Sequence, residues 1–144
     1  MKTFHLTKKK REGFTLIEVL VGIFLVGAAL IGLAQMFTYG VLNNYRADNL
    51  TNATFLAQQQ IDNIRNLTGD EISALSSPLD ETLDTNKDGT PDFRRITQIE
   101  FTSNVWNIRV MVFPASQLGE DLNSLTSNPI QNEVRADVST TIGR

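Results

Sequence analysis

One long apolar run, from Phe14 to Ala34, restricts what this chain can fold into more than any other feature. Only Thr15 and one carboxylate, Glu18, interrupt it. As an α-helix rising ~1.5 Å per residue, the run would be roughly 30 Å long, about the thickness of the hydrocarbon core of a bilayer. A basic Lys-Lys-Lys-Arg segment, residues 8–11, precedes it and favours a cytoplasmic N-terminal end. The sequence therefore predicts one membrane-spanning helix.

Glu18 is the unusual residue in this run, because an ionised carboxylate deep in lipid costs on the order of 3 kcal/mol or more. Three interpretations are open. Glu18 could stay near the lipid headgroups, or it could complete a T-x-x-E capping box that begins at Thr15. It could also pair with a cation. If the chain is cut after Gly13, the new amine of Phe14, on the same or a neighbouring chain, would be such a cation.

The segment 8–21 reads KKKREGFTLIEVLV, and this order of residues resembles the processing and assembly signature of type IV pilins and type II secretion pseudopilins. The resemblance covers about residues 8–37. It implies that a prepilin peptidase/N-methyltransferase cleaves between Gly13 and Phe14 and then methylates the amine of Phe14. It also implies that Glu18 pairs with the amino terminus of an adjacent subunit during assembly.

The same resemblance implies a structural role in a filament. The expected partners are other pilin or pseudopilin subunits, the inner membrane and an assembly platform, with the head first outside the cytoplasm and then in a periplasmic or cell-surface filament. Residues 54–65, TFLAQQQIDNIR, are similar to the helix end of minor pilins of the PilV type and minor pseudopilins. This favours a minor subunit, and leaves open a pilus, a secretion or a DNA-uptake system.

Composition argues against catalysis and against nucleic-acid binding. The chain has no cysteine, and its one histidine, His5, lies in the predicted leader. The usual nucleophile–base pairs and zinc ligands are therefore missing after cleavage. The net charge is −3, and five of the 13 basic residues precede Phe14, so the remaining chain is still more acidic. Nucleic-acid contacts require a basic face.

Two alternative interpretations compete with the filament subunit. A secretory signal peptide cut after Ala34 would also have a basic start and an apolar core. That core would be longer than the usual ~7–15 residues and would contain an acid. The second alternative is a single-pass, membrane-anchored binding module, outside the cytoplasm, that uses a calcium-braced loop and does not polymerise.

The expected fold is α+β: a long N-terminal helix packed on a small antiparallel sheet of three or four strands. The expected divisions are a cleaved leader (1–13), a membrane and filament-core helix (14–37), its amphipathic continuation (38–69) and a β-rich head (70–144). The helix is predicted to end near Thr68 with Gly69 as its C-cap. Apolar residues at spacings of three and four should face the head: Leu50, Ala53, Ala57, Ile61, Ile64 and Leu67.

Alternation of apolar and polar residues predicts the strands. Residues 95–101 and 106–112 should form a hairpin about a turn at 102–104, ended by Pro114, and residues 134–138 should form a third strand. Trp106 is predicted to lie in the core. Residues 69–92 read as a polar loop, and residues 115–132 as a polar connection with room for one short helical turn.

A calcium site is a further hypothesis for the polar loop. Residues 84–92, DTNKDGTPD, offer oxygen ligands at alternate positions with glycine at the sixth, the pattern of a calcium-binding loop. The candidate ligands are Asp84, Asn86, Asp88, the carbonyl of Thr90, and Asp92. The twelfth position, usually an acid, is Arg95, so Asp80 or Glu81 would have to replace it. The alternative is a solvated Asp-Asn-Gly turn without metal.

Overall fold

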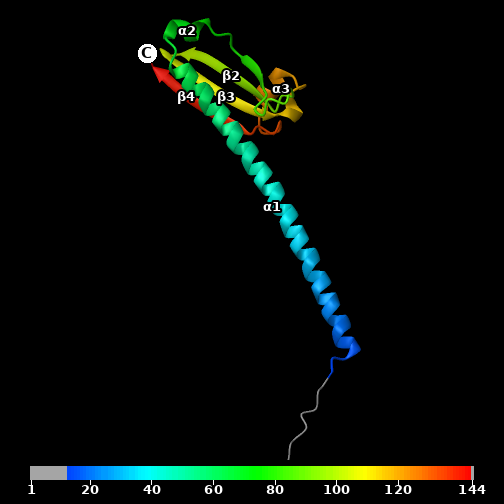
Figure 1. Cartoon of the computed structure of the whole chain (residues 1–144). Coiled ribbons are helices and arrows are strands. Elements are labelled where there is room, and N and C mark those ends of the chain that lie inside the picture. Colours follow the sequence, from blue (N-terminus) through cyan, green and yellow to red (C-terminus); the bar gives the residue numbers. More distant parts are fainter. Residues whose placement is uncertain (1–12, 144) are drawn as a thin grey trace, which may run out of the picture. The chain divides into compact units, whose positions relative to one another are not determined.

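The computed structural model describes residues 13–143, so the predicted leader, apart from Gly13, lies outside the described residues. Helix α1 runs from Leu16 to Arg65. The chain divides into two compact units between Asn43 and Asn44, and α1 contributes to both (Figure 1).

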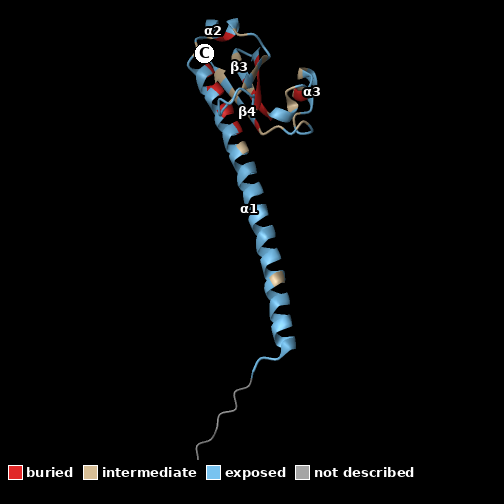
Figure 2. Ribbon diagram, turned by 45° about the vertical axis from the view of Figure 1, so that its right-hand side comes forward, coloured by how far each residue is buried: buried red, intermediate tan, exposed pale blue. Residues whose placement is uncertain are grey.

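The first unit contains the N-terminal part of α1. In Figure 2 almost every one of its residues is exposed, including large apolar side chains such as Phe24 (72% exposed). Its best 18-residue window has a mean hydropathy of 2.6, and none of that window is buried. Within residues 13–143, α1 is the one helix long and apolar enough to cross a membrane. By length and composition, this agrees with the predicted membrane helix.

The second unit is an α+β head with a four-stranded antiparallel sheet in the order β1-β2-β3-β4. The fold class predicted from the sequence is confirmed. The strands are β1 (Leu79–Leu83), β2 (Phe93–Thr102), β3 (Val105–Pro114) and β4 (Ala136–Gly143). Two short α-helices, α2 (Gly69–Ala74) and α3 (Leu122–Ser127), and one 3₁₀ turn, η1 (Ala115–Gln117), complete the head.

The central hairpin joins β2 to β3 through two residues, Ser103 and Asn104, with φ angles of 55° and 66°. Two successive positive φ angles are typical of the turn whose twist matches that of paired strands. The predicted turn and the end of β3 at Pro114 are confirmed. Both strands are longer than predicted, because β2 begins at Phe93 and β3 at Val105.

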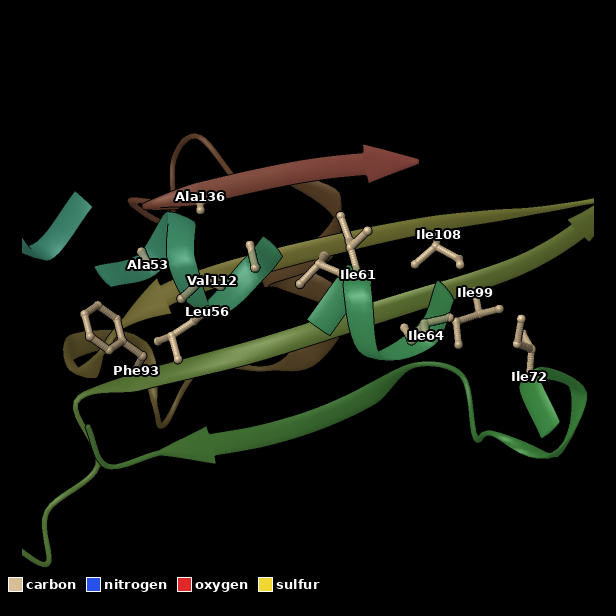
Figure 3. Close-up of a cluster of buried hydrophobic side chains, with 12 residues drawn as sticks. Ala53, Leu56, Ile61, Ile64, Ile72, Phe93, Ile99, Ile108, Val112 and Ala136 are labelled. Atoms are coloured by element: carbon tan, nitrogen blue, oxygen red, sulfur yellow. The ribbon is translucent and has the colours of Figure 1, made fainter. Parts of the chain in front are cut away.

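The main core lies between α1 and one face of the sheet (Figure 3). Ala53, Ala57, Ile61 and Ile64 are buried there, as predicted, and Trp106 packs partly buried against the cluster. Leu50 was wrongly assigned to this face and is 47% exposed, because the buried part of α1 begins only at Ala53. The prediction also missed Leu56 and Gln60, both of which are buried.

A second, smaller core lies on the opposite face of the sheet. Ile96, Met111 and Phe113 are buried there with Leu125 of α3. The carboxylate of Asp121 caps α3 by accepting from the N–H groups of its first turn. Met111 alternates along β3 with Val110 and Val112, which face the main core, so it lies on the opposite face, where Leu125 of α3 packs in the same cluster.

Two expectations for residues 66–92 were wrong. Helix α1 ends at Arg65, and Gly69 begins α2 instead of capping α1. Thr68 caps α2 through a capping box with Glu71, since each side chain binds the other's backbone N–H. The supposed polar loop also contains β1, which pairs with β2 from Leu79↔Thr97 to Leu83↔Phe93. The last strand begins at Ala136, two residues later than predicted.

Candidate processing and assembly site

The N-terminus of α1 is defined by Thr15. Residues 13–15 are not helical, and the helix begins at Leu16. The hydroxyl of Thr15 accepts a hydrogen bond from the backbone N–H of Glu18 at 3.3 Å. Its carbonyl accepts from the N–H groups of Glu18 (3.1 Å) and Val19 (3.3 Å). Thr15 is therefore the N-cap, and its half of the predicted capping box is formed.

The peptide bond between Gly13 and Phe14 lies in the exposed segment directly before this cap. Phe14 is 82% exposed. A Cβ atom added to Gly13 would meet nothing within 4 Å. The segment around this bond is exposed, and packing within residues 13–143 gives no reason for a glycine at this position.

Glu18 lies in the first turn of α1, where a negative charge is favourable because the helix N-terminus carries partial positive charge. Exposed apolar side chains flank it, among them Ile17 and Val19. Within residues 13–143, its carboxylate makes no hydrogen bond or ion pair. The carboxylate is therefore available to a positive partner that approaches from outside the helix.

Four glycines of α1 share an open environment: a Cβ added to any of Gly22, Gly27, Gly32 and Gly40 would meet nothing within 4 Å. Packing within residues 13–143 therefore does not require glycine at these positions. In a membrane or a filament, glycines allow the backbones of two helices to approach closely.

The loop between β1 and β2 folds back on itself through its own carboxylates. Asp84 accepts hydrogen bonds from the N–H groups of Lys87 (2.6 Å) and Gly89 (2.8 Å), and Gly89 has a φ of +90°. The amide oxygen of Asn86 accepts from the N–H of Asp88 at 2.9 Å. Glycine at the sixth position thus supplies the turn that the sequence pattern requires.

Two of these carboxylates are bound by threonines. Asp88 accepts hydrogen bonds from the hydroxyl and the N–H of Thr90. These bonds lower the pKa of Asp88 below its usual 3.8, and the bond from the hydroxyl has the larger effect. Asp92 accepts from the hydroxyl and the N–H of Thr85, which lowers the pKa of Asp92 in the same way. Hydrogen bonds to a carboxylate favour its charged form.

The loop therefore has the backbone turn of the calcium pattern, but its acids do not converge. Within the described part of the chain, no three His, Cys, Asp or Glu side chains are grouped so as to hold a metal ion. Asp80 and Glu81, the suggested replacements for an acid at the twelfth position, are paired with arginines in the structure. Arg94 binds Asp80 at 2.7 Å, and Arg95 binds Glu81 at 2.7 Å. Calcium binding by the loop stays a prediction.

Those two arginine pairs were missed in the sequence. Each crosses from β1 to β2, and the only available signal was a pair of adjacent acids in one segment and a pair of adjacent arginines in the next. Arg94 also donates to the carbonyls of Gln117 (3.1 Å) and Glu120 (2.6 Å) before α3. The hydrogen bonds that Arg94 donates to the carboxylate of Asp80 raise the pKa of Arg94.

Beside the loop, the head has an open cavity of about 490 Å³ whose lining is both polar and apolar. Tyr45, Asn49 and Asn52 of α1 form one side, and Asn86 and Asp92 of the loop form another.

Comparison with known proteins identifies one segment. The family model described as the prokaryotic N-terminal methylation motif matches residues 8–34. This range contains the Gly13–Phe14 bond, the Thr15 cap and Glu18. No curated protein and no solved structure matches the chain.

Proposed function

We propose that the chain is a filament subunit of the type IV pilin or type II secretion pseudopilin kind. The proposal is supported by the N-terminal signature of these proteins at residues 8–34. The role is structural, and the helix-end pattern at residues 54–65 favours a minor subunit. The observation that carries the proposal is the succession of three features within the six residues from Gly13 to Glu18: an exposed Gly13–Phe14 bond, a helix cap and a carboxylate with no partner in the described residues.

Maturation would begin with the precursor in the inner membrane, basic leader inside and head outside. A prepilin peptidase would cleave between Gly13 and Phe14, and the same enzyme would transfer one methyl group to the new amine. Cleavage converts the neutral peptide nitrogen of Phe14 into a cation four residues before Glu18. The cell thus creates the positive partner of this carboxylate only in the processed protein.

Assembly would follow as the apolar part of α1 exchanges contacts with lipid for contacts with helices of other subunits at the assembly platform. Pairing of Glu18 with the amine of a neighbour would replace an unpaired charge by an ion pair. Buried ion pairs contribute little net stability but are costly to break. Glu18 would therefore fix the position of each added subunit more than it stabilises the filament.

The test is the mass of the mature protein isolated from membranes or sheared filaments. A chain that begins at methylated Phe14 supports the proposal. A chain that retains the leader, or begins at Gln35 as after a secretory cut, contradicts it. Gly13→Val should leave an uncut precursor, and the open space around Gly13 means that misfolding would not explain that result.

A second candidate function is the membrane-anchored binding module with a calcium-braced loop. The cavity beside residues 84–92 is the observation that favours it. Such a module would remain in the membrane fraction when surface filaments are sheared off and sedimented, whereas a filament subunit would sediment with them. Calorimetric titration with millimolar calcium tests the loop separately, and absence of heat would end the calcium hypothesis.

A further inference from the structure

Thr15 connects the two functional elements of the N-terminus. Its hydroxyl binds the N–H of Glu18, and the non-helical residues just before it include both residues of the Gly13–Phe14 bond. The hydroxyl of Thr15 caps the N-terminal end of the helix, so the helix begins at Leu16 and does not extend back to Gly13. The cap therefore sets both where the helix begins and where the non-helical segment ends.

The helix needs this cap because its first N–H groups have no acceptor within the helix. Near or inside lipid, unsatisfied N–H groups are especially unfavourable, since water is scarce. Without the hydroxyl, the simplest remedy is to add helical residues at the N-terminal side, so that carbonyls of residues before Thr15 become acceptors and the open N–H groups move toward water. That change would draw Phe14 and Gly13 into helical conformation.

We infer that Thr15 is a positioning residue for leader cleavage: its hydroxyl caps α1 and so keeps the Gly13–Phe14 bond outside the helix, where a peptidase can bind it. The inference rests on the proposed function, since it concerns the cleavage of that bond. It assigns to Thr15 a role before assembly, distinct from the pairing of Glu18 after cleavage.

The experiment measures the rate at which a prepilin peptidase cleaves the full-length precursor in membrane vesicles. Thr15→Val keeps the shape of the side chain and removes the cap. Caps of this kind shift the local equilibrium about fivefold, so cleavage should slow by a factor of up to about five. Thr15→Ser and Thr15→Asn restore a capping oxygen and should restore the rate, since both residues cap helices at least as well as threonine.

The matched control is Thr38→Val. The hydroxyl of Thr38 donates to the carbonyl of Ala34 at 3.0 Å within the same helix, far from the cleaved bond. This variant should be cleaved at the wild-type rate. In detergent micelles, the Cα chemical shift of Phe14 should be that of extended backbone in the wild type and move toward helical values in Thr15→Val.

Three outcomes overturn the inference. Wild-type cleavage of Thr15→Val would show that the cap does not control the bond. Rescue by Ser but not by Asn would show that the peptidase reads the hydroxyl itself. Equal slowing by Thr38→Val would show a general effect on the helix. In each case Gly13→Val is the separate test of the proposed function: if it too is cleaved normally, the proposed processing site is wrong.

Discussion

Arg95 offers the sharpest test of what holds the head together. It is 6% exposed and lies on the face of the sheet that packs against α1. Its guanidinium donates twice to Glu81 on β1, at 3.0 and 2.7 Å, and once to the carbonyl of Leu56 in α1, at 3.2 Å. One side chain therefore ties β1, β2 and α1 together.

We expect Arg95→Met to destabilise the head by about 2–3 kcal/mol. Removing one partner of a fully buried ion pair costs about 3–5 kcal/mol, because the other charge is left without water or a counter-charge. The side chain of Glu81 is 35% exposed and regains part of its hydration, which lowers that cost. The carbonyl of Leu56 loses a donor, and methionine retains the length and most of the apolar contacts of the arginine stem.

Urea denaturation of the full chain in detergent measures this effect. Urea is preferable to guanidinium, because a salt would screen the ion pair. Trp106 is the only tryptophan, and it packs partly buried beside Phe101, with ring centroids 4.6 Å apart. Its fluorescence therefore reports unfolding of the sheet and not of the membrane helix.

Arg109→Met is the matched control. Arg109 also makes a two-bond contact across strands, to Asp137 at 2.9 and 2.6 Å, but the two side chains are 39% and 32% exposed. Exposed pairs contribute only about 0–1 kcal/mol. Equal losses for Arg95→Met and Arg109→Met would refute the role of burial. The double variant Glu81→Leu/Arg95→Met should be close to the wild type, because no charge is left unpaired.

Three further predictions concern single side chains. Glu18→Ala should be processed normally but incorporate poorly into filaments, as measured by the ratio of sheared to membrane-bound protein; normal incorporation would count against pairing with the amine. Thr97→Val should raise the free energy of unfolding by about 1 kcal/mol, because the hydroxyl of Thr97 is fully buried and has no hydrogen-bond partner in the described structure. A loss of stability in this variant would show that the hydroxyl has a partner after all. The carboxyls of Asp88 and Asp92 should titrate in NMR spectra below their usual 3.8, so that the loop keeps its hydrogen bonds above that pH and loses them as the pH falls through the lowered pKa values. Thr90→Val should move the titration of Asp88, but not that of Asp92, back toward 3.8.

Local chemistry was enough to predict several parts of this protein. The apolar run from Phe14 to Ala34, the Thr15–Glu18 cap and the turn at Ser103–Asn104 depend on neighbouring residues, and each pattern has few alternative structures. The alternation that predicted β2 and β3 is local in the same sense. For this reason the fold class and the N-terminal signature could both be predicted from the sequence.

Only the tertiary structure decided which surfaces meet. Periodicity showed that Leu50 and Ala53 are on related positions of one helix, but the buried part of α1 begins at Ala53. Met111 reads as an outward-facing residue until α3 covers that face of the sheet. The acids of β1 look like loop residues until Arg94 and Arg95 lie opposite them. A pattern along the chain records the preference of each residue, whereas burial and pairing depend on partners distant in sequence.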